Sequence, residues 1–306
     1  MINKNDRIAV TSRSFSRDSI LRQELLSKYK YVSFNDHGIK LEGDSLVKFL
    51  KGSTMAITAL ETIDKDILAL LPDLKLISKY GVGTDMIDME AMNYYGVKLS
   101  WKGGVNRRSV SELVVSFAIS LLRHVPEAHR EVISGKWSQH IGGYLSGSVF
   151  GIIGCGFIGK DLVKLLQPFN CKILVNDIKN YSDFYDSYGI TPVSKEELLI
   201  KADIVSLHVP LNESTKNIIS AKDLLLMKPN AVLINTARGG LIDEIALKDM
   251  LINGKLLGAA LDVFTIEPPE DKELLELKNL LVTPHIGGSS NEAILAMGRA
   301  AIMGLK

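Results

Sequence analysis

Short apolar runs alternate with helix-like segments over residues 7–99. Apolar residues recur at helical spacing in the segments 18–26, 45–50 and 64–71. Strand and helix in alternation are typical of a parallel sheet covered by helices on both faces. We therefore predict an α/β domain. Its predicted strands are 7–11, 31–34, 55–59, 74–78 and 97–99.

The alternation resumes after the Gly-rich segment Lys102–Asn106 and a long helix from about Ser109. Eight of the ten residues from Leu113 to Leu122 are apolar, so this helix is expected to be buried on more than one side, within one subunit or also against a second. A capping box at Ser194–Glu197 begins a helix ahead of one strand. The six strands predicted here are 149–153, 173–176, 203–209, 231–236, 257–263 and 280–283.

The last predicted helix, from Ser290 to about Lys306, is too short to fold alone. We expect it to return to the first domain, which makes that domain discontinuous. The predicted division is a domain of residues 1–100 plus 286–306 and a domain of residues 101–285.

Composition excludes several classes of protein. The 306 residues suffice for about two domains, and 36 basic against 35 acidic residues give no field that favours nucleic acid or an anionic membrane. The longest apolar stretch is too short to span a bilayer, and the start of the chain lacks the apolar core of a signal peptide. Cys155 and Cys171 fit no metal or redox spacing and are expected to be reduced packing residues. A cytoplasmic location is the resulting expectation.

The strand 149–153 runs directly into the motif G-x-G-x-x-G, at Gly154, Gly156 and Gly159. The first glycine allows a tight turn, the second lets backbone approach a pyrophosphate, and the third permits close helix–strand packing. The next strand ends at Asp177, where a carboxylate accepts from a ribose 2′-hydroxyl and repels a 2′-phosphate. NAD is therefore the expected cofactor, in preference to NADP.

Three polar residues follow the later strands: Arg238, Glu267 and His285. Hydride transfer on a 2-hydroxy or 2-oxo acid needs a cation for the carboxylate, a proton donor and acceptor, and an acid that orients that donor. A structural salt bridge for the arginine and an exposed turn for the glutamate are the competing interpretations. His208 also ends a strand, so the sequence leaves it open as the acid.

Other polar features are less specific. The loop from Lys79 to Asp85 follows a strand at the sheet edge where ligands bind, although its glycines also suit a simple turn. Arg107 and Arg108 precede the long helix, where they could serve a bound anion or carboxylate or could form a solvated surface pair. Four histidines are expected to be bystanders without an acidic partner at useful spacing, and no metal site is expected: His37, His124, His129 and His140.

Six segments of the chain carry a family resemblance: Gly81–Asp88, Asn106–Leu113, Gly151–Gly159, Asn235–Gly240, Ala259–Pro268 and Thr283–Ser289. Together they resemble the D-isomer-specific 2-hydroxyacid dehydrogenase family, and its phosphoglycerate dehydrogenase-like branch in particular. The resemblance extends over nearly the whole chain from about Thr54. It implies two Rossmann-like, doubly wound parallel-sheet domains, the first flavodoxin-like, with the active-site cleft between them.

The resemblance also implies roles for residues. His285 is expected to be the acid/base, Glu267 its partner and Arg238 the substrate clamp. Substrate contacts are further expected from Lys79, Tyr80, Val82 and Gly83. The expected cofactor contacts, besides the motif glycines and Asp177, are Phe157, Ile158, Val209, Pro210, Thr236, Ala237, Asp262, Gly287 and Gly288. A homodimer through the helix starting near Ser109 is implied as well.

Departures from the family pattern limit which substrate can be assigned. Phosphoglycerate dehydrogenases carry arginine in the loop after the third strand, where this chain has Glu61, whose charge opposes a phosphate. Lys79 is the cation in the adjacent loop that could reach a second anionic group, so phosphoglycerate remains a candidate substrate. The serine-sensing domain of longer relatives is expected to be absent. Glu267 disfavours formate oxidation, because that branch carries glutamine there, and an NAD-sensing corepressor remains the non-enzymatic alternative.

Overall fold

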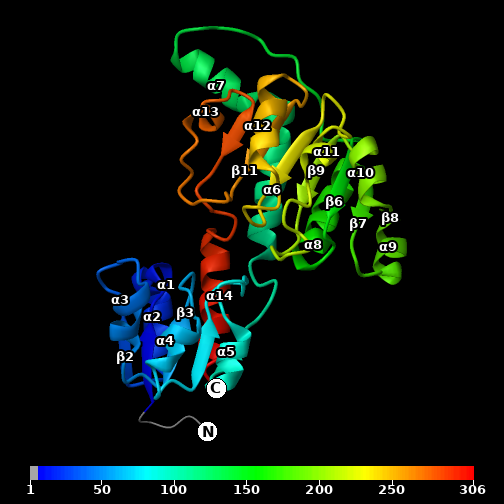
Figure 1. Ribbon diagram of the computed structural model, residues 1–306. Helices are drawn as coiled ribbons and strands as arrows, with labels where there is room; N and C mark the ends of the chain where they lie inside the picture. The colour runs from blue at the N-terminus through cyan, green and yellow to red at the C-terminus, as the bar shows by residue number, and fades with distance from the viewer. Residues whose placement is uncertain (1–5) are drawn as a thin grey trace. The chain divides into compact units, whose positions relative to one another are not determined.

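The computed structural model describes residues 6–306, which fold into two compact units (Figure 1). The first unit combines Met1–Asn106 with Gly288–Lys306, and the second is Arg107–Gly287. The predicted boundaries, after residues 100 and 285, lie six and two residues earlier along the chain. Within the described residues, no helix is long and apolar enough to cross a membrane.

The first unit is built on a five-stranded parallel sheet of order β2-β1-β3-β4-β5, the flavodoxin-like order. Alternate residues of β1 face opposite sides, so Ile8 and Val10 pack with one helical layer and Ala9 with the other. The strands are β1 (Arg7–Val10), β2 (Tyr31–Phe34), β3 (Met55–Thr58), β4 (Leu76–Lys79) and β5 (Lys98–Ser100).

Two helical layers cover this sheet. One layer comprises α1 (Arg13–Arg17), α2 (Ser19–Leu26) and α14 (Asn291–Met303), and the other α3 (Gly43–Leu50), α4 (Lys65–Ala69) and α5 (Met89–Tyr94). The sequence pattern missed α1 and α5, which have five and six residues and so present too little periodicity. Each is nevertheless capped, by Ser12 and Asp88 respectively, whose side chains accept from a backbone amide of the first turn.

The C-terminal helix α14, red in Figure 1, belongs to the first unit. Its buried face includes Ala293, Met297 and Ala301. Ser78 Oγ on β4 donates to the carbonyl of Ala301 over 2.7 Å. The helix thus buries an apolar face that it could not bury alone.

The second unit is built on a seven-stranded parallel sheet of order β12-β11-β10-β9-β6-β7-β8. Counted from β6, this order begins as the dinucleotide-binding arrangement 3-2-1-4-5-6 and adds one strand. The strands are β6 (Val149–Ile153), β7 (Lys172–Asn176), β8 (Thr191–Pro192), β9 (Ile204–Leu207), β10 (Val232–Asn235), β11 (Gly258–Leu261) and β12 (Leu280–Val282). The two-residue β8, which includes a proline, was not predicted.

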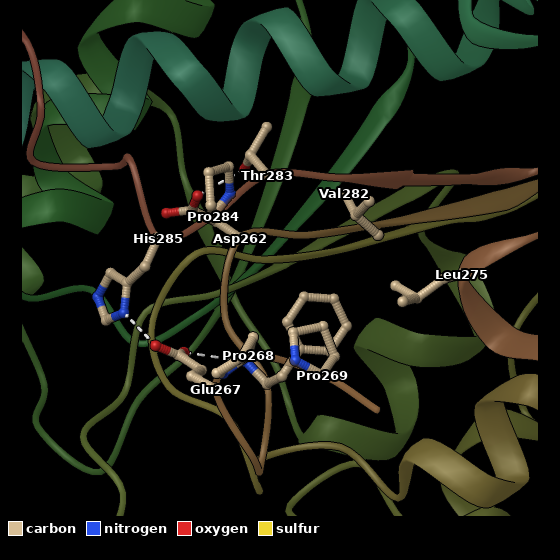
Figure 2. A pocket seen from close by; sticks show the side chains of 10 residues that line it. Asp262, Glu267, Pro268, Pro269, Leu275, Val282, Thr283, Pro284 and His285 are labelled. Carbon is tan, nitrogen blue, oxygen red and sulfur yellow. Dashed lines mark hydrogen bonds and ion pairs between the residues drawn. The ribbon is translucent and has the colours of Figure 1, made fainter. Parts of the chain in front are cut away.

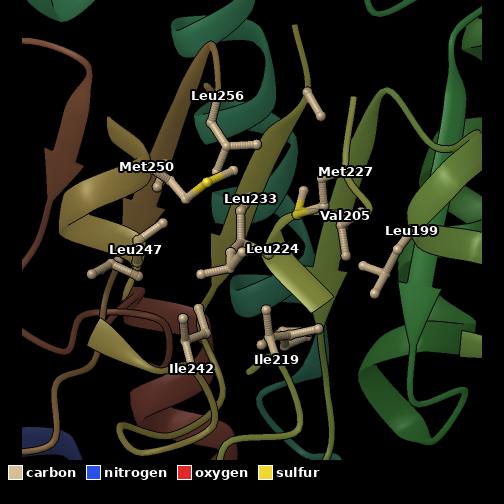
Figure 3. Packing of buried hydrophobic residues seen from close by; sticks show 14 of the residues in the cluster. Leu199, Val205, Ile219, Leu224, Met227, Leu233, Ile242, Leu247, Met250 and Leu256 are labelled. Atoms are coloured by element: carbon tan, nitrogen blue, oxygen red, sulfur yellow. The ribbon is translucent and has the colours of Figure 1, made fainter. Parts of the chain in front are cut away.

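Helices cover both faces of this sheet as well. One layer comprises α6 (Arg107–Leu122), α8 (Phe157–Leu166) and α9 (Ser182–Tyr188), and the other α10 (Lys195–Lys201), α11 (Ala221–Leu224) and α12 (Glu244–Ile252). Figure 3 shows the second layer, where leucines of these helices lie over Val205 of β9 and Leu233 of β10. The remaining helices are α7 (Val125–Ile133), η1 (Gln167–Phe169) and α13 (Lys272–Leu275).

Within one chain the α6 helix buries a single face, so the second buried side of the prediction would have to lie against another subunit. Val114, Phe117 and Leu121 are buried, whereas Ile119 is 38% exposed. At α10, the capping box is half formed: Ser194 Oγ accepts from the amide of Glu197 over 3.1 Å, and the reciprocal bond is not present within the described residues.

The contact between α2 and α14 gives a test of the packing in the first unit. A Cβ at Gly298 would lie 2.3 Å from Cδ1 of the fully buried Leu21. We expect Gly298→Ala to lower the free energy of unfolding by about 1–3 kcal/mol and Leu21→Ala by about 2–5 kcal/mol. The double variant should lose less unfolding free energy than the sum of the two single losses, by about 1 kcal/mol or more. The reason is that alanine at position 21 makes room for the methyl added at position 298.

The measurement is urea unfolding followed by Trp101 fluorescence in a Trp137→Phe background, so that the signal comes from the first unit. If the two changes in unfolding free energy simply add, Leu21 and Gly298 do not constrain each other's packing.

Candidate active site

The Gly-rich turn after β6 uses its three glycines differently. Gly154 has φ +99°, and a Cβ there would lie 2.6 Å from the carbonyl oxygen of His208. A Cβ at Gly159 would lie 2.2 Å from the carbonyl oxygen of Gly154. At Gly156, by contrast, a Cβ would meet no described atom within 4 Å. Two glycines are thus required by packing, and the third leaves open space beside the start of α8.

Asp177 stands beside this turn at the end of β7. Its Oδ2 accepts from the amide of Cys155 over 2.5 Å, and its Oδ1 accepts from the amide of Lys179 over 2.8 Å. The carboxylate is thereby held against the turn, and each oxygen keeps a second lone pair for a hydroxyl. Burial raises the pKa of Cys155 to about 11, so its thiol stays protonated and unreactive, as a packing residue should.

The turn after β10 carries Arg238 and is built by Asn235. The Asn235 amide donates to the carbonyl of Arg238 over 2.7 Å and accepts from the amide of Ala237 over 3.0 Å. Arg238 Nη1 donates to the carbonyl of Ala237 over 2.7 Å. A Cβ at Gly239 would lie 1.9 Å from the carbonyl oxygen of Phe264, so this turn presses against the turn after β11.

The turn after β11 carries Glu267, which contacts His285 from the turn after β12. The distance between Glu267 Oε2 and His285 Nδ1 is 2.9 Å, as Figure 2 shows. Glu267 Oε1 accepts from the amide of Phe264 over 3.1 Å, which fixes the carboxylate. Since a carboxylate only accepts, His285 donates a hydrogen bond from Nδ1. Its Nε2 is left to exchange a proton with a substrate.

Asp262, at the end of β11, holds the turn that carries His285. Its buried carboxylate accepts from Thr283 Oγ1 over 2.5 Å and from the amides of Ile286 and Gly287, each over 2.7 Å. His285 itself has φ +55°, a left-handed conformation that is unfavourable for a non-glycine residue. This structural role was not predicted; its signal is an aspartate directly after a buried apolar strand.

A cavity of about 510 Å³ lies beside the His285–Glu267 pair (Figure 2). The two polar residues stand at one side of it, and most of the remaining wall is apolar. Its other lining residues are Asp262, Phe264, Pro268, Pro269, Leu275, Val282, Thr283 and Pro284.

His208, which the sequence left open as the acid, is unsuited to that role. Burial lowers its pKa to about 3, so the ring is neutral at physiological pH. Its Nε2 lies 2.9 Å from Ser206 Oγ, and its Nδ1 is buried without a hydrogen-bond partner in the described chain. His285 is the better placed of the two histidines.

Other predicted cofactor residues lie at the same edge of the second sheet. Val209 follows β9, and its Cγ1 would lie 2.9 Å from a Cβ at Gly154. Thr236 follows β10, and its Oγ1 is buried with no partner among residues 6–306. This orphan hydroxyl, the open space at Gly156 and the carboxylate of Asp177 fit a dinucleotide that lies along the strand ends. Phe157, Ile158, Pro210 and Ala237 lie in or directly beside these turns.

The first unit contains the predicted substrate loop. The Lys79 ammonium is buried and donates to the carbonyl of Ala59. Tyr80 packs edge-to-face on Phe15 in the core, and its hydroxyl lies 3.1 Å from Ser14 Oγ. The carbonyl of Val82 accepts from Trp101 Nε1 over 2.8 Å.

Gly288 falls in the first unit, as the predicted division has it, and a Cβ there would lie 3.2 Å from Asn106 Nδ2. Its neighbour Gly287, predicted in the same domain, falls in the second unit. Arg107 and Arg108 both pair with Asp161 on α8, with Nε–carboxylate distances of 3.7 and 3.0 Å. These arginines therefore brace α6 against α8, while both side chains remain 53% exposed, as in a solvated pair.

Comparison with known proteins decides the family. Residues 115–287 match the model of the D-isomer specific 2-hydroxyacid dehydrogenase, NAD binding domain. The chain belongs to this family. It is accordingly an NAD-dependent D-2-hydroxyacid dehydrogenase, which supports the enzyme over the corepressor alternative.

Similar proteins include enzymes with several substrates. A hydroxypyruvate reductase of Thermotoga maritima is 35% identical over 92% of this chain and 92% of its own length. A D-3-phosphoglycerate dehydrogenase of Methanocaldococcus jannaschii is 37% identical over 84% of this chain but only 50% of its own length. The structure of D-lactate dehydrogenase from Aquifex aeolicus, complexed with NAD and lactic acid, is 26% identical over 98% of this chain and 94% of that one, with a TM-score of 0.85.

The different surroundings of the motif glycines predict different defects. Gly156→Ala should leave thermal stability nearly unchanged and weaken NADH binding, because its methyl enters the open space. Gly159→Ala should lower the melting temperature, because its methyl meets backbone at 2.2 Å. Calorimetry and NADH titration of both variants measure the two effects. Equal losses of stability would contradict this division of roles.

Proposed function

We propose that the enzyme reduces a small, unphosphorylated 2-oxo acid to its D-2-hydroxy acid. The observation that carries the chemistry is the 2.9 Å contact between His285 and Glu267, with the Arg238 turn on the neighbouring strand end. An acid/base, its orienting carboxylate and a cation thus come from turns after three adjacent strands. This is the set that the reaction needs.

In this proposal His285 carries the proton at Nε2. When bound, NADH would supply the hydride that reduces C2 of the keto acid. His285 donates a proton to the carbonyl oxygen, so the C=O bond becomes a CH–OH group. In oxidation, neutral His285 takes the hydroxyl proton back. Glu267 keeps the imidazole oriented through Nδ1 throughout.

Arg238 would bind the substrate carboxylate bidentately, a geometry that a planar guanidinium suits. The backbone amides of Val82 and Gly83 would add hydrogen bonds to the same carboxylate. Tyr80 would contribute through its backbone, since its ring belongs to the core of the first unit. The cofactor would be held by the turn from Gly154 to Gly159 and by Asp177.

Two observations in the first unit favour an unphosphorylated substrate. The Lys79 ammonium is buried and engaged by the Ala59 carbonyl, which reduces its availability to a phosphate. Glu61 lies in the same loop, where its Oε2 accepts from the Ala59 amide over 2.6 Å. Its negative charge there would repel a second anionic group. The reductase relative that matches over 92% of its length points the same way.

A homodimer is part of the proposal. The α7 helix has no buried residue, and Val132 and Ile133 are 52% and 73% exposed. Trp137, Ile141 and Tyr144 in the following segment are each more than 80% exposed. An apolar surface of this kind next to α6 is typical of an interface. Light scattering that gives the mass of a single chain would contradict the homodimer.

The cytoplasmic location stays a prediction.

The function is tested by NADH oxidation with matched keto acids: hydroxypyruvate, its 3-phosphate ester and glyoxylate. We expect the unphosphorylated acids to have the higher kcat/KM, and NADPH to be a poorer donor than NADH because of Asp177. Preference for the phosphate ester would overturn the substrate assignment but leave the reaction class intact. Tight NADH binding without turnover of any keto acid would overturn the reaction itself.

The clamp role predicts a specific defect for Arg238→Lys. The charge stays but the planar fork is lost, so kcat/KM should fall by roughly two orders of magnitude. NADH affinity should change little. Arg123→Lys, at an exposed position on the same unit, is the matched control and should behave as the parent enzyme. Near-normal turnover in Arg238→Lys would remove this arginine from the site.

A further inference from the structure

A second cluster of ionisable side chains lies at the start of α7 and in the segment after it. One ligand atom each from His124, Glu127 and His140 lie within 4.8 Å of one another. His124 is the N-cap residue of α7, and Glu127 is in the first turn. The rings of His124 and His140 are stacked, with centroids 5.6 Å apart. The sequence predicted these histidines to be bystanders.

Glu131 gives this cluster the outer contact that a metal site requires. Its Oε2 lies 2.9 Å from His140 Nε2. A carboxylate oxygen only accepts, so His140 donates to it from Nε2–H. His140 then keeps its lone pair on Nδ1. Histidines that ligate a metal usually donate a hydrogen bond from their other ring N–H to a carboxylate, a backbone carbonyl or a water.

The prediction that His140 lacks an acidic partner is therefore wrong. Glu131 and His140 are nine residues apart, a separation that a helical pattern does not bring together. The contact arises because the chain turns back after α7 ends at Ile133. Such a reversal has no simple sequence signal.

The charge of the cluster also favours a divalent cation. Glu127 and Glu131 lie on successive turns of α7 and bring two negative charges. The one basic group paired with Glu127 in the described chain is Lys278, whose Nζ is 3.7 Å away. Lys278 is largely exposed and can swing aside, since exposed pairs of this kind contribute little.

We propose that His124, Glu127 and His140 bind a zinc ion, with Glu131 as the residue that orients His140. Two imidazoles and a carboxylate are zinc ligands, and a water completes four-coordination. Tetrahedral zinc holds its ligand atoms about 3.4 Å apart, so modest side-chain rotations close the site. The ion would tie the segment after α7 back to the start of that helix. This site is separate from the His285–Glu267 pair and independent of the proposed substrate.

The test is a zinc titration of the untagged, full-length protein against a chromogenic chelator. We expect one zinc ion per chain, with His124→Ala and His140→Ala each lowering affinity at least a hundredfold. His129→Ala is the matched control, because His129 lies on the same helix but outside the cluster. It should bind zinc as the parent protein does.

Two further measurements distinguish a zinc ion in this cluster from one bound at the active-site histidine. Glu131→Gln should weaken zinc binding by roughly tenfold to a hundredfold, since the orienting charge is lost while the ligands remain. Co²⁺ in place of zinc should give the visible absorption of a tetrahedral site, and His140→Ala should remove it. Zinc binding that survives in His124→Ala and His140→Ala would overturn the proposal. Loss of binding in His285→Ala instead would assign the ion to the active-site pair.

Discussion

The carboxylate of Asp262 is the interaction on which the site depends. It is buried at the end of β11, and it accepts hydrogen bonds from a hydroxyl and two amides of the turn after β12. Those three bonds offset the cost of burying a charge and of placing His285 in a left-handed conformation. They fix the backbone of the turn from which the His285 imidazole contacts Glu267. The site is therefore built by the backbone of one strand end and the side chain of its neighbour.

The parallel register of the second sheet brings the rest of the site together. The turns after β10, β11 and β12 lie at one edge because neighbouring parallel strands end on the same side. The turn after β6 lies at this edge too, where the strand order reverses between β6 and β9. Asp177, the Gly-rich turn and the turns that carry Arg238 and His285 therefore share one edge of one sheet. This is the edge at which the proposal places both the cofactor and the proton donor.

Much of this arrangement could be predicted from the sequence. All the strands except β8 were predicted, since their apolar runs are bounded by turn residues and are long enough to be distinctive. The Gly-rich motif and the three strand-end residues were predicted because chemistry restricts residue type there. Asp262 was expected at the cofactor, whereas its carboxylate accepts from the Thr283 hydroxyl and from two amides of the turn after β12. The sequence predicts that an aspartate at the end of a strand lies near the site. It does not predict which amides donate hydrogen bonds to its carboxylate.

Contacts between residues distant along the chain were the hardest to predict. Lys79 was predicted as a cation that could reach a second anionic group of the substrate, whereas the fold buries its ammonium against the carbonyl of Ala59, just after β3. Arg107 and Arg108 meet Asp161 across two helices, and His140 meets Glu131 across a reversal of the chain. Each pairing depends on packing between elements, which local pattern does not encode.

The central claim is that His285 transfers the proton and takes no part in holding the dinucleotide. The most direct test compares kcat/KM for keto-acid reduction with NADH affinity in His285→Ala. The account predicts a fall in kcat/KM of roughly two to four orders of magnitude, with the dissociation constant for NADH within about twofold of the parent value. Retained turnover, or a loss of NADH affinity as large as the loss of turnover, would contradict it.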